Sequence, residues 1–371
     1  MNFWLLLFVI DLILFILTAA TVVYMTIFAI AAYFHKKPVV PKSKRQNRFI
    51  ILIPAYKKDD TIIRAVKSVL SQTYPQRLFD VTVISDHEDE LTNFRLAQLP
   101  ITLLTPNFKK SSKGKSLQLA IHNLPQFKIY DVVLVLDADN IVLPEFLEEL
   151  NNAYEYAGTK AIQVHRLSQN RDTPMAIIDA TFEEIHNVIF RLGHTSTGLS
   201  SALAGSGMAF DFKWFKENIY KTKTSHEDKE LEALLLKDHI FIDYFSNIYV
   251  FDEKTREPYD FMRQRKRWIT GQYQAALNNM RFLPKALINK QYDFVDKVAQ
   301  WLLIPRSILL GITILMSIVL PFVYFTLVVK WWILFAYTLF LFASLTPDYL
   351  VDKQWSLAFI KAPLLLFKKR Q

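Results

Sequence analysis

A long apolar run near the N-terminus, residues 3–34, limits the fold of this chain more than any other feature. About 20 apolar residues cross a bilayer as a helix, and this run supplies more. A removable secretion signal is disfavoured, because no basic segment precedes the run and no small-residue cleavage site follows it. Six Lys and Arg residues then lie within residues 36–48. The positive-inside rule therefore predicts a transmembrane helix in residues 1–35 and a basic linker, 36–48, on the cytoplasmic side.

Two more apolar runs, 307–329 and 331–350, lie near the other end of the chain. They predict two transmembrane helices within residues 298–351, joined on the outer side by a turn at 330–332. Lys361 and Pro363 interrupt the last segment, so residues 352–371 are predicted to form an amphipathic, basic cytoplasmic tail. The whole pattern predicts a multi-pass protein of the cell inner membrane (plasma membrane) with a cytoplasmic middle.

The net charge of +9 fits a membrane surface better than nucleic acid. The basic residues concentrate beside apolar runs and do not form a stripe interleaved with aromatic residues, so we expect no nucleic-acid partner. The chain has no cysteine, which excludes disulfides and thiolate metal sites.

Between the apolar ends, strand-like aliphatic runs alternate with helical patterns. The runs are RFIILIPAY from residue 48, VTVIS from 81, ITLLTP from 101 and VVLVLD from 132. This alternation predicts an α/β domain over residues 49–272 with a Rossmann-like, mostly parallel sheet. Residues 273–297 mix aromatic side chains with Lys and Gln, which predicts an interfacial amphipathic helix along the inner leaflet.

Acidic residues follow two of these strand-like runs. Asp86 follows VTVIS, and Asp137 and Asp139 follow the apolar residues 132–136. Ligands of open α/β sheets bind at such carboxyl ends of strands. Two carboxylates on one turn can hold Mg²⁺ or Mn²⁺, and such a cation can clamp a diphosphate; the alternative is a solvated acidic turn. Asp86 could accept a hydrogen bond from the nucleobase or ribose of a nucleotide donor.

A basic segment, Lys113-Gly114-Lys115-Ser116, imitates the end of a phosphate-binding P-loop. A true P-loop needs glycine five residues before Gly114, and Lys109 stands there, so P-loop kinases and ATPases are excluded. A basic loop that opens a helix can still meet a donor phosphate, which makes Lys115 a candidate donor contact.

Two later motifs complete the candidate site. Glu227 and Asp228 begin a helical run, where acids also simply complement a helix dipole. Gln264, Arg267 and Trp268 are spaced i, i+3 and i+4 and therefore share one helix face. Arg suits a diphosphate and Trp offers a surface for a sugar ring. The alternative is a basic helix resting on anionic lipid, which also describes Arg263, Arg265 and Lys266.

Taken together, these motifs resemble those of the membrane-bound family 2 glycosyltransferases, a group that includes cellulose, hyaluronan and poly-N-acetylglucosamine synthases and ceramide glucosyltransferases. The matching segments are PAY (54–56), Asp86, KGK (113–115), DAD (137–139), LAGSGMAF (203–210), ED (227–228) and QRKRW (264–268). The resemblance covers residues 48–275. It implies a GT-A fold and inverting transfer of a sugar from a nucleotide sugar, usually a UDP-sugar, with Mg²⁺ or Mn²⁺.

The resemblance also implies roles for individual residues. The resemblance assigns catalysis to Asp228, as the base, together with Glu227 and Arg267. It assigns metal binding to Asp137 and Asp139, and acceptor binding to Trp268, Gly205 and Ser206. The residues that it assigns to the donor are Tyr56, Asp59, Asp86, Lys115, Asp137 and Gln264. Two departures stand out: PAY is followed by Lys57-Lys58-Asp59-Asp60 rather than Asn-Glu-Glu, and His226 replaces the usual Thr before Glu-Asp.

The predicted function is therefore hexosyl transfer from a UDP-hexose or UDP-N-acetylhexosamine to a lipid or saccharide acceptor at the membrane, in surface polysaccharide (exopolysaccharide) or glycolipid synthesis. Three spans give few walls for a pore, so polymer export would need a partner or an oligomer, and few additions are favoured over many. The alternative is a catalytically silent nucleotide-binding scaffold of a polysaccharide-export complex. A metal-dependent hydrolase is disfavoured, because the sequence has no His-rich cluster.

Overall fold

The computed structural model describes residues 3–367, with side chains for residues 4–361, and it is organised around one eight-stranded sheet. The strand order is β3-β2-β1-β4-β7-β6-β8-β5. The pairs β1–β2, β1–β4, β2–β3 and β6–β8 are parallel, and antiparallel pairs surround β7 and β5. The predicted α/β class with a mostly parallel sheet is confirmed. The strands are β1 (Phe49–Tyr56), β2 (Phe79–Asp86), β3 (Thr102–Leu104), β4 (Val132–Val135), β5 (Ile141–Val142), β6 (Ala161–Ser168), β7 (Met208–Asp211) and β8 (Ile242–Asp252).

Helices cover both faces of the sheet, which explains why its central strands are continuous aliphatic runs. One face packs against α2 (Asp59–Leu70), α3 (Glu90–Ala97) and α5 (Phe146–Ala157). The other packs against α4 (Lys113–His122), α8 (Phe212–Asn218) and α9 (Glu227–Lys237). The first residues of α4 and α9 therefore approach the carboxyl end of β4.

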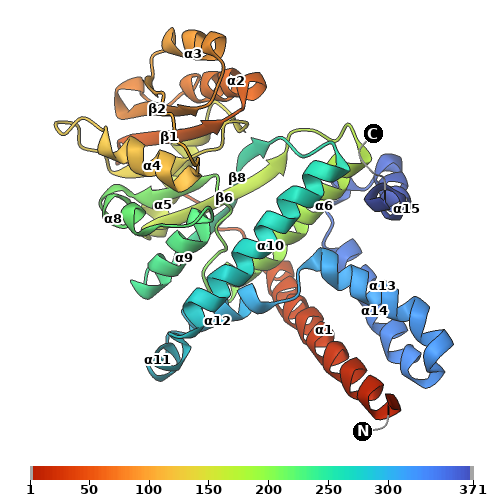
Figure 1. The fold of residues 1–371 in the computed structure, drawn as a ribbon. Coiled ribbons are helices and arrows are strands. Elements are labelled where there is room, and N and C mark those ends of the chain that lie inside the picture. Colours follow the sequence, from red (N-terminus) through yellow and green to blue (C-terminus); the bar gives the residue numbers. More distant parts are fainter. Residues whose placement is uncertain (1–2, 368–371) are drawn as a thin grey trace.

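A second group of helices connects the sheet to the long apolar helices (Figure 1). It contains α6 (Pro174–Asn187), the π-helical segment η2 (Val188–Gly193), α7 (His194–Ser196), α10 (Pro258–Met280), α11 (Leu283–Ile288) and α12 (Tyr292–Leu302). The segment 273–297, predicted as one helix, is divided among the end of α10, α11 and the start of α12. Lys290 adopts a left-handed backbone, with φ of +54°, and a helix of L-residues cannot continue through such a residue.

Three helices are long and apolar enough to cross a membrane within the described part of the chain. They are α1 (Phe3–Tyr33), α13 (Arg306–Val323) and a segment that ends in α14 (Val328–Ser344). The predicted turn at 330–332 is displaced, because Lys330 and Trp331 already lie inside α14. Both contact Asp11 of α1: Lys330 forms an ion pair with it, and Trp331 Nε1 donates to Asp11 Oδ1 at 2.8 Å.

Contacts along α1 show how far the apolar helices run side by side. The rings of Trp4 and Tyr324 lie 6.2 Å apart, and the backbone N–H of Ile304, just before α13, lies 3.4 Å from Thr21 Oγ1. The 17 residue steps from 4 to 21 correspond to about 26 Å of helix, close to the hydrocarbon thickness of a bilayer, roughly 30 Å. Beyond this level α1 packs on η2, where a Cβ at Gly193 would lie 2.3 Å from a carbonyl oxygen of α1.

The last helix, α15 (Lys353–Phe367), runs through Pro363 and packs against α6. Trp355 Nε1 donates to Thr181 Oγ1 at 3.1 Å, and Ala358 is fully buried. Residues 368–371 of the predicted basic tail lie outside the described residues.

Candidate active site

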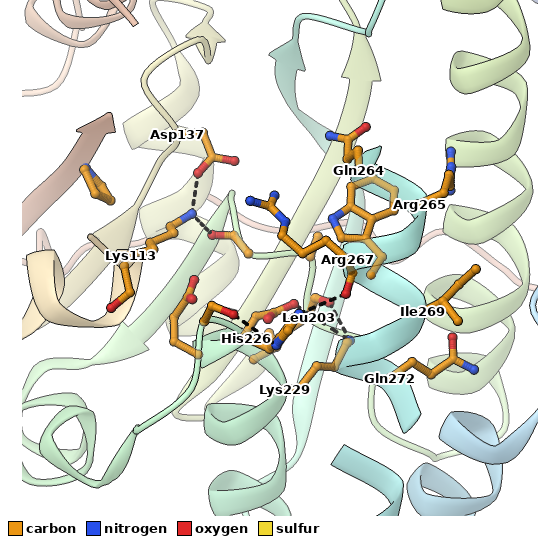
Figure 2. Close-up of a pocket in the computed structure, with 18 of the residues that line it drawn as sticks. Lys113, Asp137, Leu203, His226, Lys229, Gln264, Arg265, Arg267, Ile269 and Gln272 are labelled. Carbon is orange, nitrogen blue, oxygen red and sulfur yellow. Dashed lines mark hydrogen bonds and ion pairs between the residues drawn. The ribbon is translucent and has the colours of Figure 1, made fainter. Parts of the chain in front are cut away.

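A cleft of about 840 Å³ lies at the carboxyl ends of the central strands. It extends from β1, β2 and β4, past the first turn of α9 and one face of α10, to the connector between α12 and α13. Figure 2 shows some of the side chains that line it. Most of the residues predicted from the sequence line it: Tyr56, Asp86, Asp137, Asp139, Gly205, Glu227, Asp228, Gln264, Arg267 and Trp268. Residues more than 200 positions apart therefore share one site.

Three predicted contacts do not line this cleft. Lys115 is exposed, and its Nζ donates to the carbonyl of Lys110 at 2.8 Å. The Asp59 carboxylate accepts from the backbone N–H of Asp89 at 2.8 Å. Ser206 is fully buried, and its Oγ accepts from the backbone N–H of Asp137 at 3.1 Å. Ser206 therefore holds the backbone of the DAD turn, which a sequence motif alone cannot distinguish from an acceptor contact.

Two lysines neutralise the DAD carboxylates. Lys113 Nζ forms an ion pair with Asp137 and donates to the carbonyl of Gly205 at 2.6 Å (Figure 2). Lys58 Nζ lies 2.7 Å from Asp139 Oδ2. Burial raises the pKa of Asp139, although Lys58 opposes that shift. Burial acts in the same direction on Asp137, but the positive charges around it, Lys113 above all, outweigh burial and lower its pKa.

The two DAD carboxylates fit a hard divalent cation only as part of its ligand shell. Among the described side chains, no group of three or more His, Cys, Asp or Glu residues is placed to hold a metal. Mg²⁺ commonly binds one or two carboxylates and takes its other ligands from water and substrate phosphates. Asp137 and Asp139 suit that arrangement. The ammonium groups of Lys58 and Lys113 already place positive charge beside these carboxylates, where a cation would bind. Both lysine side chains would have to swing aside for the carboxylates to bind a cation.

The acidic pair at the start of α9 differs in exposure. Glu227 is only 3% exposed, and burial raises its pKa to about 8 against the opposing effect of Lys113. Asp228 is partly exposed in the cleft, and the nearest cation, Lys229 Nζ, lies 4.0 Å from its Oδ2. Asp228 is therefore the member of the pair whose carboxylate an incoming molecule can reach.

A contact that sequence reasoning did not find joins α9 to α10. His226, just before the acidic pair, places Nε2 2.9 Å from the carbonyl oxygen of Arg267 (Figure 2). This approach requires glycine at position 271, because a Cβ there would lie 2.1 Å from His226 Cδ2. The available signal was an isolated glycine inside a helical pattern, which usually has a packing reason.

The face of α10 carries the other predicted residues. The Arg267 guanidinium has no hydrogen-bond or ion-pair partner among the described residues and remains free to bind an anion. Arg265 does not point to a lipid surface. Its guanidinium pairs with Asp179 at 2.5 Å and stacks 4.7 Å from the ring centroid of Trp268. Arg263 does lie outward, with 73% of its side chain exposed.

Comparison with known proteins gives a family and a fold. The family model for glycosyl transferase family group 2 matches residues 132–346. The solved mannosyltransferase PcManGT from Pyrobaculum calidifontis, in complex with GDP-Man and Mn²⁺, aligns with a TM-score of 0.58 at 15% identity over 89% of this chain and 98% of that one. TarS 1–349 from S. aureus aligns with a TM-score of 0.45 at 15% identity over 86% of this chain and 88% of that one. The chain matches no curated protein sequence.

Proposed function

The chain belongs to glycosyl transferase family group 2 and is a glycosyltransferase, and we propose that it transfers a hexose or N-acetylhexosamine, with inversion, from a nucleotide sugar to an acceptor at the membrane. The observation that supports this best is the content of one cleft. It holds two carboxylates on a strand-end turn, a partly exposed carboxylate at Asp228 and an unpaired guanidinium at Arg267. The predicted donor is a UDP-sugar, and the GDP-Man bound by PcManGT makes a GDP-sugar the second donor to test.

In the proposed reaction the acceptor oxygen attacks the anomeric carbon and its proton passes to Asp228. The new bond forms as the bond from that carbon to the diphosphate oxygen breaks, so the nucleoside diphosphate leaves and the anomeric centre inverts. A positioned base of this kind contributes about 10²–10⁴ in rate. With its raised pKa, Glu227 is largely protonated at pH 7 and adds little negative charge beside the base.

Binding of the diphosphate falls to cations and to the DAD turn. Arg267 offers two parallel N–H donors to phosphate oxygens. Asp137 and Asp139 would hold Mg²⁺ or Mn²⁺, which supplies charge neutralisation to the leaving diphosphate when bound. Lys58 and Lys113, released from the carboxylates, can turn toward the phosphates.

The nucleoside lies at the other end of the cleft, on Tyr56 and Asp86. Tyr56 is half exposed beside the ring of His87, with centroids 5.7 Å apart. Asp86 is buried and its Oδ1 lies 2.6 Å from His87 Nδ1. Asp59 and Lys115 are secondary donor contacts that need side-chain movement, and Gly205 and Trp268 border the acceptor.

The three apolar helices support a location in the cell inner membrane, with the sheet domain cytoplasmic and the end of α1 near Trp4 outside. A protease site placed before residue 4 should be cut only from outside, and one placed in 36–48 only from inside. Cytoplasmic cleavage of the first site would overturn this topology.

The experiment that tests the function is nucleotide release by the purified chain from a panel of UDP- and GDP-sugars, supplied with candidate lipid and saccharide acceptors, with and without Mn²⁺. Release that depends on sugar and metal supports the proposal. Absence of release with every donor and acceptor, although nucleotide binds, would favour the silent scaffold of an export complex.

A further inference from the structure

A positive charge without a counterion lies where the cleft meets the apolar helices. Arg306, the first residue of α13, lines the cleft. Its Nη2 is 3.2 Å from His186 Nδ1, and its guanidinium lies 5.7 and 6.0 Å from the ring centroids of Phe190 and Phe182. Its Nη1 is buried and has no hydrogen-bond partner among the described residues. A guanidinium in such a place is costly unless something pairs with it.

The carboxylates near Arg306 are already taken by other cations. Asp179 pairs with Arg265 at 2.5 Å, and Glu183 pairs with Arg191 at 3.0 Å. His186 supplies no negative charge; burial, Arg191 and Arg306 hold its pKa well below its usual range, so it is neutral. Among the described residues, Arg306 therefore has no carboxylate partner of its own at this end of the cleft.

Two more buried donors in the cleft have no partner among the described residues, and one of them, Arg265, lies over the same Phe182 ring as Arg306. Arg265 Nε and Trp301 Nε1 are buried without partners, and both residues line the same cleft. Buried donors are nearly always hydrogen-bonded in folded proteins, so three unpaired donors among the residues that line one cleft indicate a missing acceptor. The amide oxygens of Gln264 and Gln300 are also unpaired there, and turning either amide over would present further N–H donors.

The surroundings specify what kind of anion fits. Leu303, Ile304 and Phe190 also line this end, and Ile304 touches α1 at Thr21, the level where the side-by-side apolar helices begin. A molecule bound at Arg306 would therefore contact the apolar helices on one side. On its other side it would meet the face of α10 that carries Trp268. Gln272 links the two by donating to the carbonyls of Trp301 and Leu303 at 3.1 and 3.0 Å.

We propose that Arg306, with Arg265 and Trp301, binds the phosphate or diphosphate head of an acceptor lipid, and that the lipid chain leaves along the apolar helices. This rests on the proposed function, which it deepens by assigning the acceptor class. A neutral glycolipid would leave the guanidinium without a counterion, and a soluble sugar phosphate would leave the apolar side of the site uncovered.

The test compares binding of farnesyl phosphate, farnesol and inorganic phosphate to the full chain in a neutral detergent, by microscale thermophoresis. Farnesyl phosphate should bind at least about 10-fold more tightly than farnesol, because a charge-assisted hydrogen bond contributes about 1.5–3 kcal/mol. Inorganic phosphate should bind far more weakly. Equal affinity for farnesol overturns the head-group site, and equal affinity for inorganic phosphate overturns its assignment to a lipid.

Variants locate the site. Arg306→Gln should lose about 10- to 100-fold in affinity for farnesyl phosphate, while Arg306→Lys should keep part of it. Arg263→Gln is the matched control, because Arg263 lies on α10 but points outward and does not line the cleft. UDP affinity should stay unchanged in every variant, which also verifies folding. If Arg306→Gln weakened UDP instead of farnesyl phosphate, Arg306 would belong to the donor site and the proposal would fail.

Two further arms separate the alternatives. Excess phosphatidylglycerol should not displace farnesyl phosphate, and full displacement would mean a general anionic-lipid contact rather than an acceptor site. Nucleotide release by the same wild-type preparation tests the proposed function separately. If nucleotide is released but farnesyl phosphate binds no more tightly than farnesol, only the proposed class of acceptor is refuted. Absence of release with every donor and acceptor refutes the function, and the binding comparison still decides whether the head-group site exists.

Discussion

Gly271→Ala is the substitution whose effect the structure specifies most closely. The added Cβ would lie 2.1 Å from His226 Cδ2, whereas ordinary contacts begin at 3.4 Å. The imidazole must therefore retreat by about 1.3 Å, the difference between these distances, and its 2.9 Å contact with the Arg267 carbonyl breaks. Because His226 precedes Glu227 and Asp228, the displacement passes directly to the proposed base.

Opposing terms set the size of the effect on stability. Overpacking costs about 1–3 kcal/mol and the lost hydrogen bond about 1 kcal/mol, while alanine in a helix gains about 1 kcal/mol over glycine. A net loss of about 1–3 kcal/mol is expected. Activity should fall further, because a misplacement of about 1 Å at a catalytic group can cost about 10²-fold.

The assay is thermal unfolding in detergent together with kcat and KM for nucleotide release. We expect kcat to fall and nucleotide affinity to stay near wild type. Gly311→Ala is the matched control, since a Cβ there meets nothing within 4 Å. The double variant His226→Ala, Gly271→Ala should regain the stability lost to the clash. If Gly271→Ala alone behaves like wild type, or the double variant recovers nothing, the reasoning from the α9–α10 contact is wrong.

Three further predictions concern charge. Asp139→Asn should abolish Mn²⁺-stimulated nucleotide release while the thermal midpoint stays within a few degrees; undiminished Mn²⁺ stimulation would exclude Asp139 as a ligand. Burial raises the pKa of Glu227 to about 8 in the folded protein, from 4.5 in the unfolded chain. Unfolding between these pH values therefore releases a proton, and the contribution of Glu227 to the free energy of unfolding falls as the pH rises from 4.5 to about 8. The thermal unfolding midpoint of Glu227→Gln should therefore rise relative to that of wild type between pH 5 and pH 8. A difference between the two midpoints that stays constant over this range would contradict the raised pKa of Glu227. Asp11→Asn should lower the free energy of unfolding by about 3 kcal/mol, because it leaves the charge of Lys330 without a partner. Adding Lys330→Met to this variant should restore part of the lost unfolding midpoint, and no restoration would refute the ion pair between Asp11 and Lys330.

Local pattern was enough to predict the sheet and the central part of the site. The aliphatic runs that form β1, β2 and β4 are buried on both faces, so their composition alone identifies them, and parallel pairing then brings Asp86 and Asp137 to one edge. The helical spacing of Gln264, Arg267 and Trp268 was also sufficient, because all three lie on the α10 face that lines the cleft.

What the sequence could not predict depends on contacts between distant side chains. The ion pair of Lys113 with Asp137 and the approach of His226 to Gly271 exist only once α4, α9 and α10 are packed. The ion pair of Lys58 with Asp139 forms only once β1 and β4 are paired. Arg306 gives no local signal, because it opens an apolar run that looks like any other membrane span. The separation of α11 from α12 follows from the left-handed backbone at Lys290, a position where composition alone favours no break.

The proposed chemistry depends on Asp228 more than on any other residue, so the most direct measurement is nucleotide release by Asp228→Asn with the best donor and acceptor. The substitution keeps size and polarity but removes the base. Release should fall by about 10²–10⁴, with UDP or GDP affinity unchanged. Release near the wild-type rate would contradict the account, because another group would then have to accept the proton of the acceptor.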